Sequence, residues 1–318
     1  MKAQDISRVA VIGAGTMGPG IAGEFARAGC DVRLVDLGPD ILRRAMKRLA
    51  DAHQALIEAK LLSAPKAEAA LKSIRPLTSL ETACDQVQLL VEALPEDMAL
   101  KQEMFRRFDA LCPEGAVLAS NTSGLSITEI ARATKRPKLV AGMHFWNPPH
   151  IMPLVEVTKG KETSDSTAEL VVEMCRRMGK RPILVRHDIP GFIGNRLQYA
   201  VLREALHLLS EGIASAEDID TAMTAGPGLR YGLLGPLRTA DLGGLDVYHT
   251  ISKYLLAELN SDSSPPAVLA EFVEKGRLGA KTGGGFYEYP KEELGKVIRQ
   301  RDRVLLGFLK VLKEQKGG

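Results

Sequence analysis

The sequence lacks the features that define several protein classes. Four cysteines occur in 318 residues, and they lie far apart without a C-x-x-C pair, at Cys30, Cys84, Cys112 and Cys175. This spacing excludes a disulfide framework, argues against a zinc site and fits reduced thiols in the cytoplasm. No apolar run approaches the roughly twenty residues of a membrane span, and the N-terminus enters a predicted strand almost at once. We therefore expect a cytoplasmic protein without a signal peptide, a membrane segment or a metal.

The sequence also has no excess of charge of one sign. Its 42 lysines and arginines nearly balance 39 aspartates and glutamates, which leaves a net charge of +3. A field that would attract nucleic acid is therefore not indicated. Hydrophobic residues make up 45% and charged residues 25%, as in ordinary soluble proteins, and the length suffices for about two domains. These properties predict an ordinary soluble protein rather than a disordered or nucleic-acid-binding chain.

The most informative segment that is present is a glycine-rich turn. Val9 to Ile12 is a short apolar run suited to a buried parallel strand, and the pattern Gly13-x-Gly15-x-x-Gly18 then opens a helical segment. In such a pattern the first glycine permits a tight turn, the second lets the backbone approach a pyrophosphate, and the third lets the helix pack closely on the strand. The amides at the helix N-terminus would face the phosphates.

A carboxylate follows at the distance that a dinucleotide site requires. The second predicted strand, over residues 31–36, ends at Asp36, where the 2′-hydroxyl of a ribose would donate to it. A 2′-phosphate would meet a like charge there, so the sequence predicts NAD rather than NADP. Glycines also mark ordinary turns, and a mononucleotide or flavin site on the same scaffold is the alternative. The agreement of strand, helix and acid favours the dinucleotide.

Strand and helix patterns alternate in the first part of the chain, which predicts a doubly wound parallel sheet of the Rossmann type with right-handed crossovers. The candidate strands cover residues 9–12, 32–35, 89–92, 116–120, 139–144, 154–158 and 182–186. Residues 39–72 read as a helical segment with a break near Ser63-Ala-Pro65, which is too long for a simple crossover. We expect a helical hairpin over about residues 40–75 that projects from the sheet.

Strand signals stop after residue 188, where we place a domain boundary. This gives an NAD-binding domain over residues 1–188 and an all-helical substrate and dimerisation domain over residues 189–318. Further helices are expected over residues 216–225, 237–259, 266–275 and 292–313. The first helix of this domain, which starts near Phe192, carries a broad apolar stripe and is expected to be largely buried. The helices look too apolar for one surface layer, which predicts a homodimer.

Polar residues that directly follow strands are the first candidates for a site, because ligands of open α/β sheets bind beyond the carboxyl ends of the strands. One candidate segment is Ala119-Ser-Asn-Thr-Ser-Gly-Leu125. Helix capping by serine or threonine is the structural alternative, since Ser126-Ile-Thr-Glu129 resembles a capping box. One serine can cap the helix while another faces the site.

A histidine and a glutamate form the second candidate. His144 ends an apolar strand, Glu156 lies within the next one, and a proline-rich connector returns the chain between them, so the side chains can meet on adjacent strands. An imidazole held by a carboxylate is a general base of fixed tautomer and raised basicity, suited to removing a proton from an alcohol. The alternative is a histidine that backbone groups satisfy at a domain edge. The sequence indicates no partner for the other histidines, which are His53, His150, His187, His207 and His249.

Seven sequence blocks occur in order along the chain: Gly13-Ala-Gly-Thr-Met-Gly18, Leu90-Val-Glu-Ala-x-x-Glu96 with Lys101, Ser120-Asn-Thr-Ser123, His144-Phe-x-Asn-Pro148, Leu154-Val-Glu156-Val, Pro190-Gly-Phe-Ile-x-Asn195-Arg and Gly283-x-Gly-Phe-Tyr-x-Tyr289. Together they resemble the 3-hydroxyacyl-CoA dehydrogenase family over essentially the whole chain. Two further segments, Asn147-Pro-Pro149 and residues 226–236, look more like its branch with lambda-crystallin/gulonate 3-dehydrogenase and carnitine dehydrogenase.

The resemblance implies a reversible, NAD-dependent oxidation of a 3-hydroxyacyl-CoA to the 3-ketoacyl-CoA, as in fatty acid β-oxidation. It assigns His144 as the base and Glu156 as its orienting partner, with Ser123 and Asn195 holding substrate oxygens. Asn195 would come from the helical domain, so closure of the two domains would complete the site. The resemblance also places Glu96 and Lys101 near the nicotinamide half of the cofactor. The full set of implied cofactor-binding residues is Gly13, Gly15, Thr16, Met17, Gly18, Asp36, Glu96, Lys101 and Asn121.

The substrate is the point at which the sequence departs from the family. A serine and a lysine on the hairpin contact CoA in the family, whereas Ala52 and Ala59 stand there in this sequence and the adjacent Lys60 is the candidate replacement. The second branch acts on free 3-hydroxy acids, and Arg230 would then bind the carboxylate, with a salt bridge as its structural alternative. The 3-hydroxyacyl-CoA ranks first because the catalytic blocks follow that pattern. A non-catalytic, crystallin-like relative is the third interpretation, although it would need none of the catalytic residues.

Overall fold

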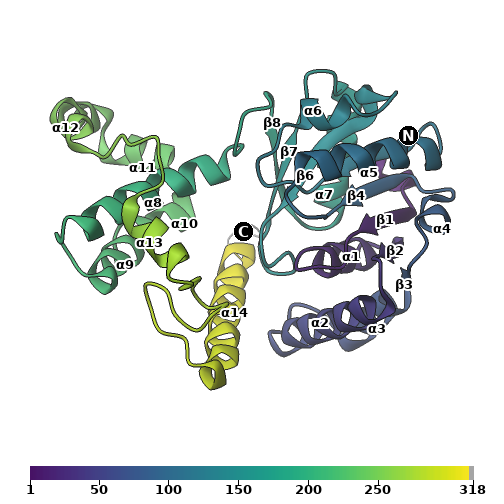
Figure 1. The fold of residues 1–318 in the computed structure, drawn as a ribbon, viewed down its shortest axis with the longest axis horizontal. Helices are drawn as coiled ribbons and strands as arrows, with labels where there is room; N and C mark the ends of the chain where they lie inside the picture. The colour runs from purple at the N-terminus through teal and green to yellow at the C-terminus, as the bar shows by residue number, and fades with distance from the viewer. Residues whose placement is uncertain (315–318) are drawn as a thin grey trace. The chain divides into compact units, whose positions relative to one another are not determined.

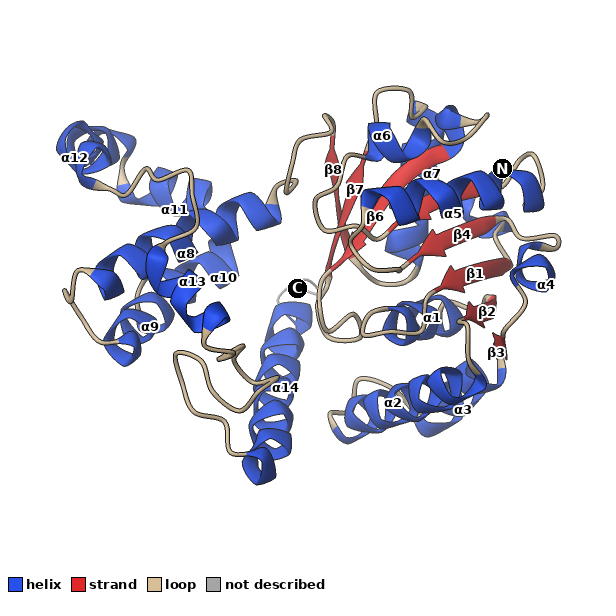
Figure 2. Cartoon of the chain, viewed as in Figure 1, coloured by secondary structure: helices blue, strands red, loops and turns tan. Residues whose placement is uncertain are grey.

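The structure is a computed structural model that describes the backbone of residues 1–314 and the side chains of residues 1–312. The chain divides into two compact units, one formed by Met1–Asn195 with Arg303–Lys310 and the other mainly by Arg196–Asp302. The eight strands found among the described residues all lie in the first unit, and the second unit consists of helices and loops (Figure 2). The predicted fold class, a Rossmann-type sheet followed by an all-helical part, is confirmed.

The sheet has the strand order β3-β2-β1-β4-β5-β6-β7-β8 (Figure 1). The strand bounds are β1 Arg8–Ile12, β2 Asp31–Val35, β3 Ile74–Leu77, β4 Leu89–Glu92, β5 Val117–Ser120, β6 Val140–Phe145, β7 Leu154–Thr158 and β8 Arg181–Val185. The sequence predicted a parallel sheet. The observed sheet is mixed, because β7 runs antiparallel to β6. The connector between them is shorter than a crossover, which needs a dozen or more residues. The missed strand β3 contains Pro76, which an edge strand tolerates.

Helices cover the sheet of the first unit. They are α1 Gly18–Arg27, α2 Pro39–Glu58, α3 Ala64–Lys72, α4 Leu80–Cys84, α5 Met98–Leu111, α6 Ile127–Ala131 and α7 Asp165–Arg177, with short 3-10 helices η1 Ala3–Asp5 and η2 Pro137–Leu139. The predicted hairpin is present as α2 and α3, which lie side by side (Figure 1). Its turn contains Lys60, whose φ of 58° ends α2. Val9 and Val11 of β1 belong to one core cluster, whereas Ala10 and Ile12 belong to another, so both faces of the sheet are buried.

The second unit contains most of α8 Gly194–Ser210, α9 Ala216–Ala225, α10 Pro227–Leu234, α11 Pro236–Gly243, α12 Leu245–Glu258, α13 Ala267–Glu274 and part of α14 Lys291–Glu314. The single helix predicted over residues 237–259 is two helices, because the chain breaks at Gly244 with a φ of 91°. The sequence did not predict α10, which starts in a segment rich in glycine and proline. In residues 1–314 no helix is long and apolar enough to cross a bilayer.

The prediction that the first helix of the second unit is largely buried is wrong. Within α8 only Leu206 is buried, and Leu197 and Tyr199 are 55% and 61% exposed. An apolar stripe at helical spacing shows that a partner surface is favoured, but it does not show that the same chain supplies one. The periodicity of α8 therefore predicted an apolar face correctly, but it could not show whether the same chain covers that face.

The last helix carries an apolar contact that belongs to the first unit. Leu306 of α14 is buried in a cluster with Leu56 of α2 and Ile151, which follows β6. Partly buried side chains around it come from α14 and from the end and turn of the hairpin, namely Leu305, Leu309, Ala55, Ala59, Leu61 and Leu62. The part of α14 within residues 303–310 therefore covers the end and turn of the helical hairpin.

Candidate active site

The glycine-rich turn between β1 and α1 has the geometry of a phosphate-binding loop. Gly13 has a φ of 105°, and a Cβ on Gly18 would lie 1.7 Å from the Gly13 carbonyl oxygen, so neither position accommodates a side chain. By contrast, a Cβ on Gly15 would meet no atom of the described residues within 4 Å. Of the neighbouring predicted residues, Thr16 is exposed and Met17 directly precedes α1. The open backbone at Gly15, beside the N-terminus of α1, fits a bound pyrophosphate.

Asp36 lies beside this turn, directly after β2. One of its carboxylate oxygens accepts a hydrogen bond of 2.7 Å from the backbone N–H of Ala14, and the other accepts one of 2.7 Å from Leu37. Arg48 of α2 closes the turn from the other side, since its guanidinium donates to the carbonyl oxygens of Ala14 and Gly15 at 2.9 Å each. Sequence reasoning missed Arg48, because no local pattern indicates which helical side chain reaches a loop more than thirty residues earlier.

The structure brings His144 and Glu156 together. They stand directly opposite each other on the antiparallel strands β6 and β7, and His144 Nδ1 lies 2.8 Å from Glu156 Oε2. The side chains are 7% and 0% exposed. Because an ionised carboxylate only accepts hydrogen bonds, the geometry assigns the proton to Nδ1 and leaves Nε2 as the basic nitrogen. This arrangement can accept a proton from a hydroxyl group.

The Glu156 carboxylate is held by donors from two segments of the chain, residues 144–146 and residues 193–194. Besides His144, the indole of Trp146 donates to Oε2 at 3.1 Å, and the backbone N–H groups of Ile193 and Gly194 donate to Oε1 at 3.0 and 2.9 Å. Burial by itself raises the pKa of Glu156, but these hydrogen bonds outweigh it and hold the pKa below the usual value. Glu156 is therefore ionised at neutral pH.

Ser123 and Asn195 also meet. Ser123 follows β5 and is exposed, and its carbonyl oxygen accepts a hydrogen bond of 2.7 Å from the side-chain amide of Asn195. Glu96 fixes the same loop, because its carboxylate accepts hydrogen bonds from Ser123 N at 2.9 Å and from Thr122 Oγ1 at 2.5 Å. The structure groups Asn195 with the sheet unit, whereas the sequence placed it in the helical domain. The contact between Asn195 and Ser123 is therefore internal to the first unit.

Lys101, predicted near the nicotinamide, and Asn121, a further predicted cofactor-binding residue, both have internal partners. Lys101 of α5 is 1% exposed and its ammonium lies 2.7 Å from Glu92 and 3.5 Å from Glu96. The side-chain oxygen of Asn121 accepts a hydrogen bond of 2.8 Å from the Phe145 backbone. Both side chains thus brace the loops beside the site. The pairing of Lys101 with the buried Glu92, at the end of β4, was not predicted. An acid inside an apolar run does not indicate which residue it pairs with.

The loop after β5 is also fixed by a helix cap. Ser126 Oγ accepts a hydrogen bond of 3.2 Å from Glu129 N, as the predicted capping box requires for the serine. Asp188 completes the cap, since its carboxylate accepts hydrogen bonds from Ser126 Oγ at 2.6 Å and from Thr128 N at 2.7 Å. Sequence reasoning missed Asp188, which lies some sixty residues further along the chain. Ser126 therefore caps α6, while Ser123 stays free of that role.

The remaining predicted substrate contacts are Lys60 and Arg230. Lys60 is exposed in the turn of the hairpin, and Arg230 is exposed on α10 of the second unit. Neither side chain takes part in the hydrogen bonds described around His144, Glu156 and Ser123. In the part of the chain that the structure describes, no group of three or more histidine, cysteine, aspartate or glutamate side chains is placed to hold a metal ion.

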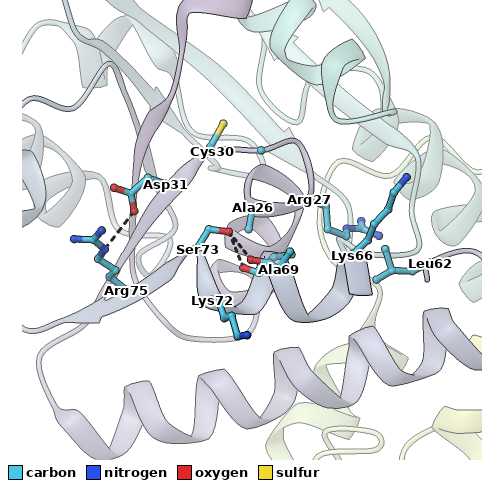
Figure 3. A pocket seen from close by; sticks show the side chains of 12 residues that line it. Ala26, Arg27, Cys30, Asp31, Leu62, Lys66, Ala69, Lys72, Ser73 and Arg75 are labelled. Atoms are coloured by element: carbon cyan, nitrogen blue, oxygen red, sulfur yellow. Dashed lines mark hydrogen bonds and ion pairs between the residues drawn. The ribbon is translucent and has the colours of Figure 1, made fainter. Parts of the chain in front are cut away.

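A pocket of about 580 Å³ lies at the N-terminal ends of strands β2 and β3 (Figure 3). The candidate site described above lies at the C-terminal ends of the strands. Basic side chains line it, but Arg27 pairs with Glu24, Lys72 lies 2.7 Å from Glu68, and Arg75 lies 3.5 Å from Asp31. Arg27 and Lys72 stand in the last turns of α1 and α3, where cations stabilise the helix dipole. Structural roles account for these charges, and the pocket is remote from the carboxyl edge of the sheet.

Comparisons with known proteins agree with this geometry. Residues 8–189 match the model of the 3-hydroxyacyl-CoA dehydrogenase NAD binding domain, and residues 191–289 match the model of the 3-hydroxyacyl-CoA dehydrogenase C-terminal domain. The chain belongs to the 3-hydroxyacyl-CoA dehydrogenase family. Members of this family are NAD-dependent oxidoreductases, and NAD is the cofactor.

Two kinds of relative are similar to the chain at nearly full length. A 3-hydroxybutyryl-CoA dehydrogenase from Clostridioides difficile is 41% identical over 89% of this chain and 100% of its own. A 5-formyl-3-hydroxy-2-methylpyridine 4-carboxylate 5-dehydrogenase from Mesorhizobium japonicum is 35% identical over 96% of this chain and 98% of its own. A crystal structure of a pyridine carboxylate dehydrogenase of that name, described as an NAD+-dependent dismutase, has a TM-score of 0.91 with 33% identity, over 97% of this chain and 99% of its own.

Proposed function

We propose that this family member oxidises a hydroxyl group of a small-molecule substrate and that His144 is the general base. The observation that carries the proposal is the imidazole fixed through Nδ1 by a buried, ionised Glu156 at 2.8 Å. NAD+, which the Gly13–Gly18 turn and Asp36 would hold, would supply the hydride acceptor for the carbon that carries the hydroxyl. His144 Nε2 takes the hydroxyl proton, so the carbonyl product forms without a free alkoxide. Glu156 stabilises the resulting imidazolium, and in the reverse direction His144 returns the proton.

Ser123 and Asn195 are proposed to hold the substrate oxygens. Ser123 is exposed and Glu96 braces its loop, so the backbone that carries its hydroxyl is fixed. The Asn195 amide is oriented by its donation to the Ser123 carbonyl. A pair of oriented polar groups beside the base would place the reacting hydroxyl within reach of Nε2.

For the substrate, the first candidate is a 3-hydroxyacyl-CoA in fatty acid β-oxidation. Both matching family models are described as domains of 3-hydroxyacyl-CoA dehydrogenase, and the relative with 41% identity is named for a 3-hydroxybutyryl-CoA. Lys60 at the hairpin turn is then the proposed contact to CoA, as an exposed cation that can approach a phosphate.

The second candidate is a small hydroxylated carboxylic acid, and the hairpin favours it. Ala52 and Ala59 replace the polar CoA contacts expected from the family, and Leu306 of α14 packs on the end of the same hairpin. The pyridine carboxylate dehydrogenase, whose named substrate carries no CoA, covers 96% of this chain. Arg230 is then the proposed partner of the substrate carboxylate, because a guanidinium binds a carboxylate in a bidentate manner.

We also propose that the active form is a cytoplasmic homodimer. The second unit exposes large apolar side chains on several helices, with exposed fractions of 55% at Leu197, 61% at Tyr199, 83% at Leu237, 72% at Leu242 and 66% at Leu256. Exposed apolar surface of this extent is typical of a protein interface. A second copy of the chain is the proposed partner.

The test combines a substrate panel with two variants. NADH oxidation is measured with acetoacetyl-CoA and with free 3-keto acids, for the wild type, His144→Gln and Arg230→Ala. We expect His144→Gln to lose turnover of every substrate while it still binds NADH. Turnover near the wild-type rate in that variant excludes His144 as the base. For a thioester substrate Arg230→Ala keeps its activity, whereas selective loss of free-acid turnover assigns the second candidate.

A further inference from the structure

Trp146 is the only tryptophan in the sequence, and it lies next to the His144–Glu156 pair. It follows β6 in the connector to β7, at a position that the family pattern leaves open. Its indole N–H donates to Glu156 Oε2 at 3.1 Å, which is the same oxygen that accepts from His144 Nδ1 at 2.8 Å. The indole and imidazole rings lie 5.7 Å apart between centroids and are tilted by 50°. The tryptophan and the histidine therefore share one acceptor atom.

This contact completes the hydrogen bonding of the carboxylate. Oε2 accepts from the imidazole and the indole, while Oε1 accepts from the backbone of Ile193 and Gly194. A carboxylate has about four acceptor positions, so all of them are taken. The imidazole is the only one of these four donors that can take up and release a proton in the proposed reaction. Across β8 the register partner of Glu156 is the neutral Ile183.

The surroundings fix the indole in this position. A Cβ on Gly194 would lie 2.3 Å from Cζ2 of Trp146, so the six-membered ring lies directly on the glycine backbone. Further along the connector, the Lys180 side chain donates to the carbonyl oxygen of Met152 at 3.1 Å and pairs with Glu24 of α1 at 3.0 Å. Packing on Gly194 thus holds the indole with its N–H at the carboxylate, in a connector that Lys180 ties to α1.

We propose that Trp146 is a positioning residue that tunes the catalytic base: its N–H takes up part of the negative charge of Glu156 and thereby weakens the hold of Glu156 on the imidazolium. The proposal rests on the proposed role of His144. A hydrogen bond donated to a carboxylate stabilises its charge and lowers its basicity. With Trp146 in place, Glu156 therefore holds the protonated imidazole less strongly than it would without the indole N–H.

The sign of the effect follows from the chemistry. If the indole N–H is removed, Oε2 keeps only the imidazole as its donor and attracts the imidazolium more strongly. Protonated His144 is then stabilised, and the pH at which half of it is protonated moves upward. Because the oxidation needs the unprotonated base, the acidic limb of the pH profile of kcat moves upward with it. A shift of about half a pH unit or more is expected for one charge-assisted hydrogen bond.

The decisive variant removes the N–H and keeps the shape. Because the chain has one tryptophan, growth of a tryptophan auxotroph on 3-benzothienylalanine exchanges only this side chain, with sulfur in place of N–H. 5-Fluorotryptophan, which keeps the N–H, is the matched control, and Trp146→Phe is the genetically simple second variant. For each protein the pH profile of kcat and the thermal midpoint are measured. The pH titration of His144 is followed by the ¹H and ¹³C signals of its Cε1–H group, assigned by their absence in His144→Gln.

The proposal is supported if the benzothienylalanine protein shows an upward shift in two quantities, the midpoint of the NMR titration and the acidic limb of the kcat profile. The fluorinated protein should keep the wild-type value of both. Unchanged midpoints in a folded benzothienylalanine protein overturn it, and so does a loss of kcat that is equal at every pH, which indicates packing alone. The NMR titration needs no turnover. If His144→Gln keeps full activity, the proposed function fails, while the titration still shows whether Trp146 acts on His144.

Discussion

The sheet contains two buried carboxylates with a basic partner, and the two pairs differ in what the partner leaves free. Glu92 ends β4 and pairs with Lys101 at 2.7 Å, with side chains 0% and 1% exposed. Glu156 on β7 pairs with His144 at 2.8 Å, with side chains 0% and 7% exposed. Distance and burial are nearly the same, so neither quantity distinguishes the proposed catalytic pair from the pair with internal partners only.

The difference lies in the chemistry of the base. The Lys101 ammonium carries its donors on one nitrogen, and that nitrogen is taken up by Glu92, Glu96 and the carbonyl oxygen of Leu94 at 3.3 Å. The imidazole has two nitrogens on opposite sides of a ring, so one can be anchored while the other faces a substrate. A buried pair is therefore suited to proton transfer only when its base has a second functional atom.

The largest expected effect that tests this comparison comes from Glu156→Gln. The neutral amide cannot stabilise an imidazolium, and its NH2 group competes with the donors that now surround the carboxylate. We expect kcat to fall about 10³-fold or more, by analogy with an orienting carboxylate replaced by its amide. The check is steady-state kinetics together with NADH binding by fluorescence. Glu92→Gln is the matched control, and an equal loss of kcat in both variants would remove the distinction between the pairs.

Next in size is the effect of Lys101→Met on stability. It leaves the Glu92 charge buried without its cation, and breaking a buried pair in this way costs about 3–5 kcal/mol. Urea unfolding measures the loss, and kcat per folded molecule is expected to stay within a few-fold of the wild type. The double variant Glu92→Gln/Lys101→Met removes the isolated charge and should regain part of the stability. A large loss of kcat in correctly folded Lys101→Met would instead assign Lys101 to the site.

A smaller effect is expected in the pH dependence of stability. The folded-state pKa of Glu156 is depressed, so its contribution to stability is present above about pH 4.3, the ordinary glutamate value, and is lost as pH falls through the lower folded-state pKa. The difference in unfolding free energy between wild type and Glu156→Gln should therefore narrow below that pH. Urea titrations between pH 3 and 7 test this, and a difference that is constant over the range contradicts it.

The smallest effect is expected for Ser120→Ala. Ser120 Oγ donates to Glu92 Oε2 at 2.6 Å, and both side chains are buried. Loss of this hydrogen bond should cost about 1–3 kcal/mol because a buried acceptor loses its partner, with kcat unchanged. Chemical unfolding and a Michaelis–Menten series measure the two quantities. A change in the pH profile would show that the structural pair communicates with the catalytic one.

Some parts of the site could be predicted because their signal is local. The glycines, Asp36 and the hairpin around Ser63 follow from spacing, and His144 and Glu156 could be paired because a short connector forces neighbouring strands to turn back. Other parts had no local signal. Arg48 reaches the glycine turn from α2, and Asp188 caps α6 from beyond β8. Long side chains that act across the fold leave no periodicity to detect.

The sequence by itself determined the alternation of strands and helices, the dinucleotide-binding turn and the identity of the residues able to carry a proton, because spacing, turn chemistry and side-chain type are properties of short segments. Only the tertiary structure decided which polar groups donate hydrogen bonds to the same carboxylate. The indole of Trp146, the backbone of Ile193 and Gly194 and the ring of His144 converge on one carboxylate. Such convergence depends on strand direction and packing between segments far apart in the chain, which no local pattern encodes.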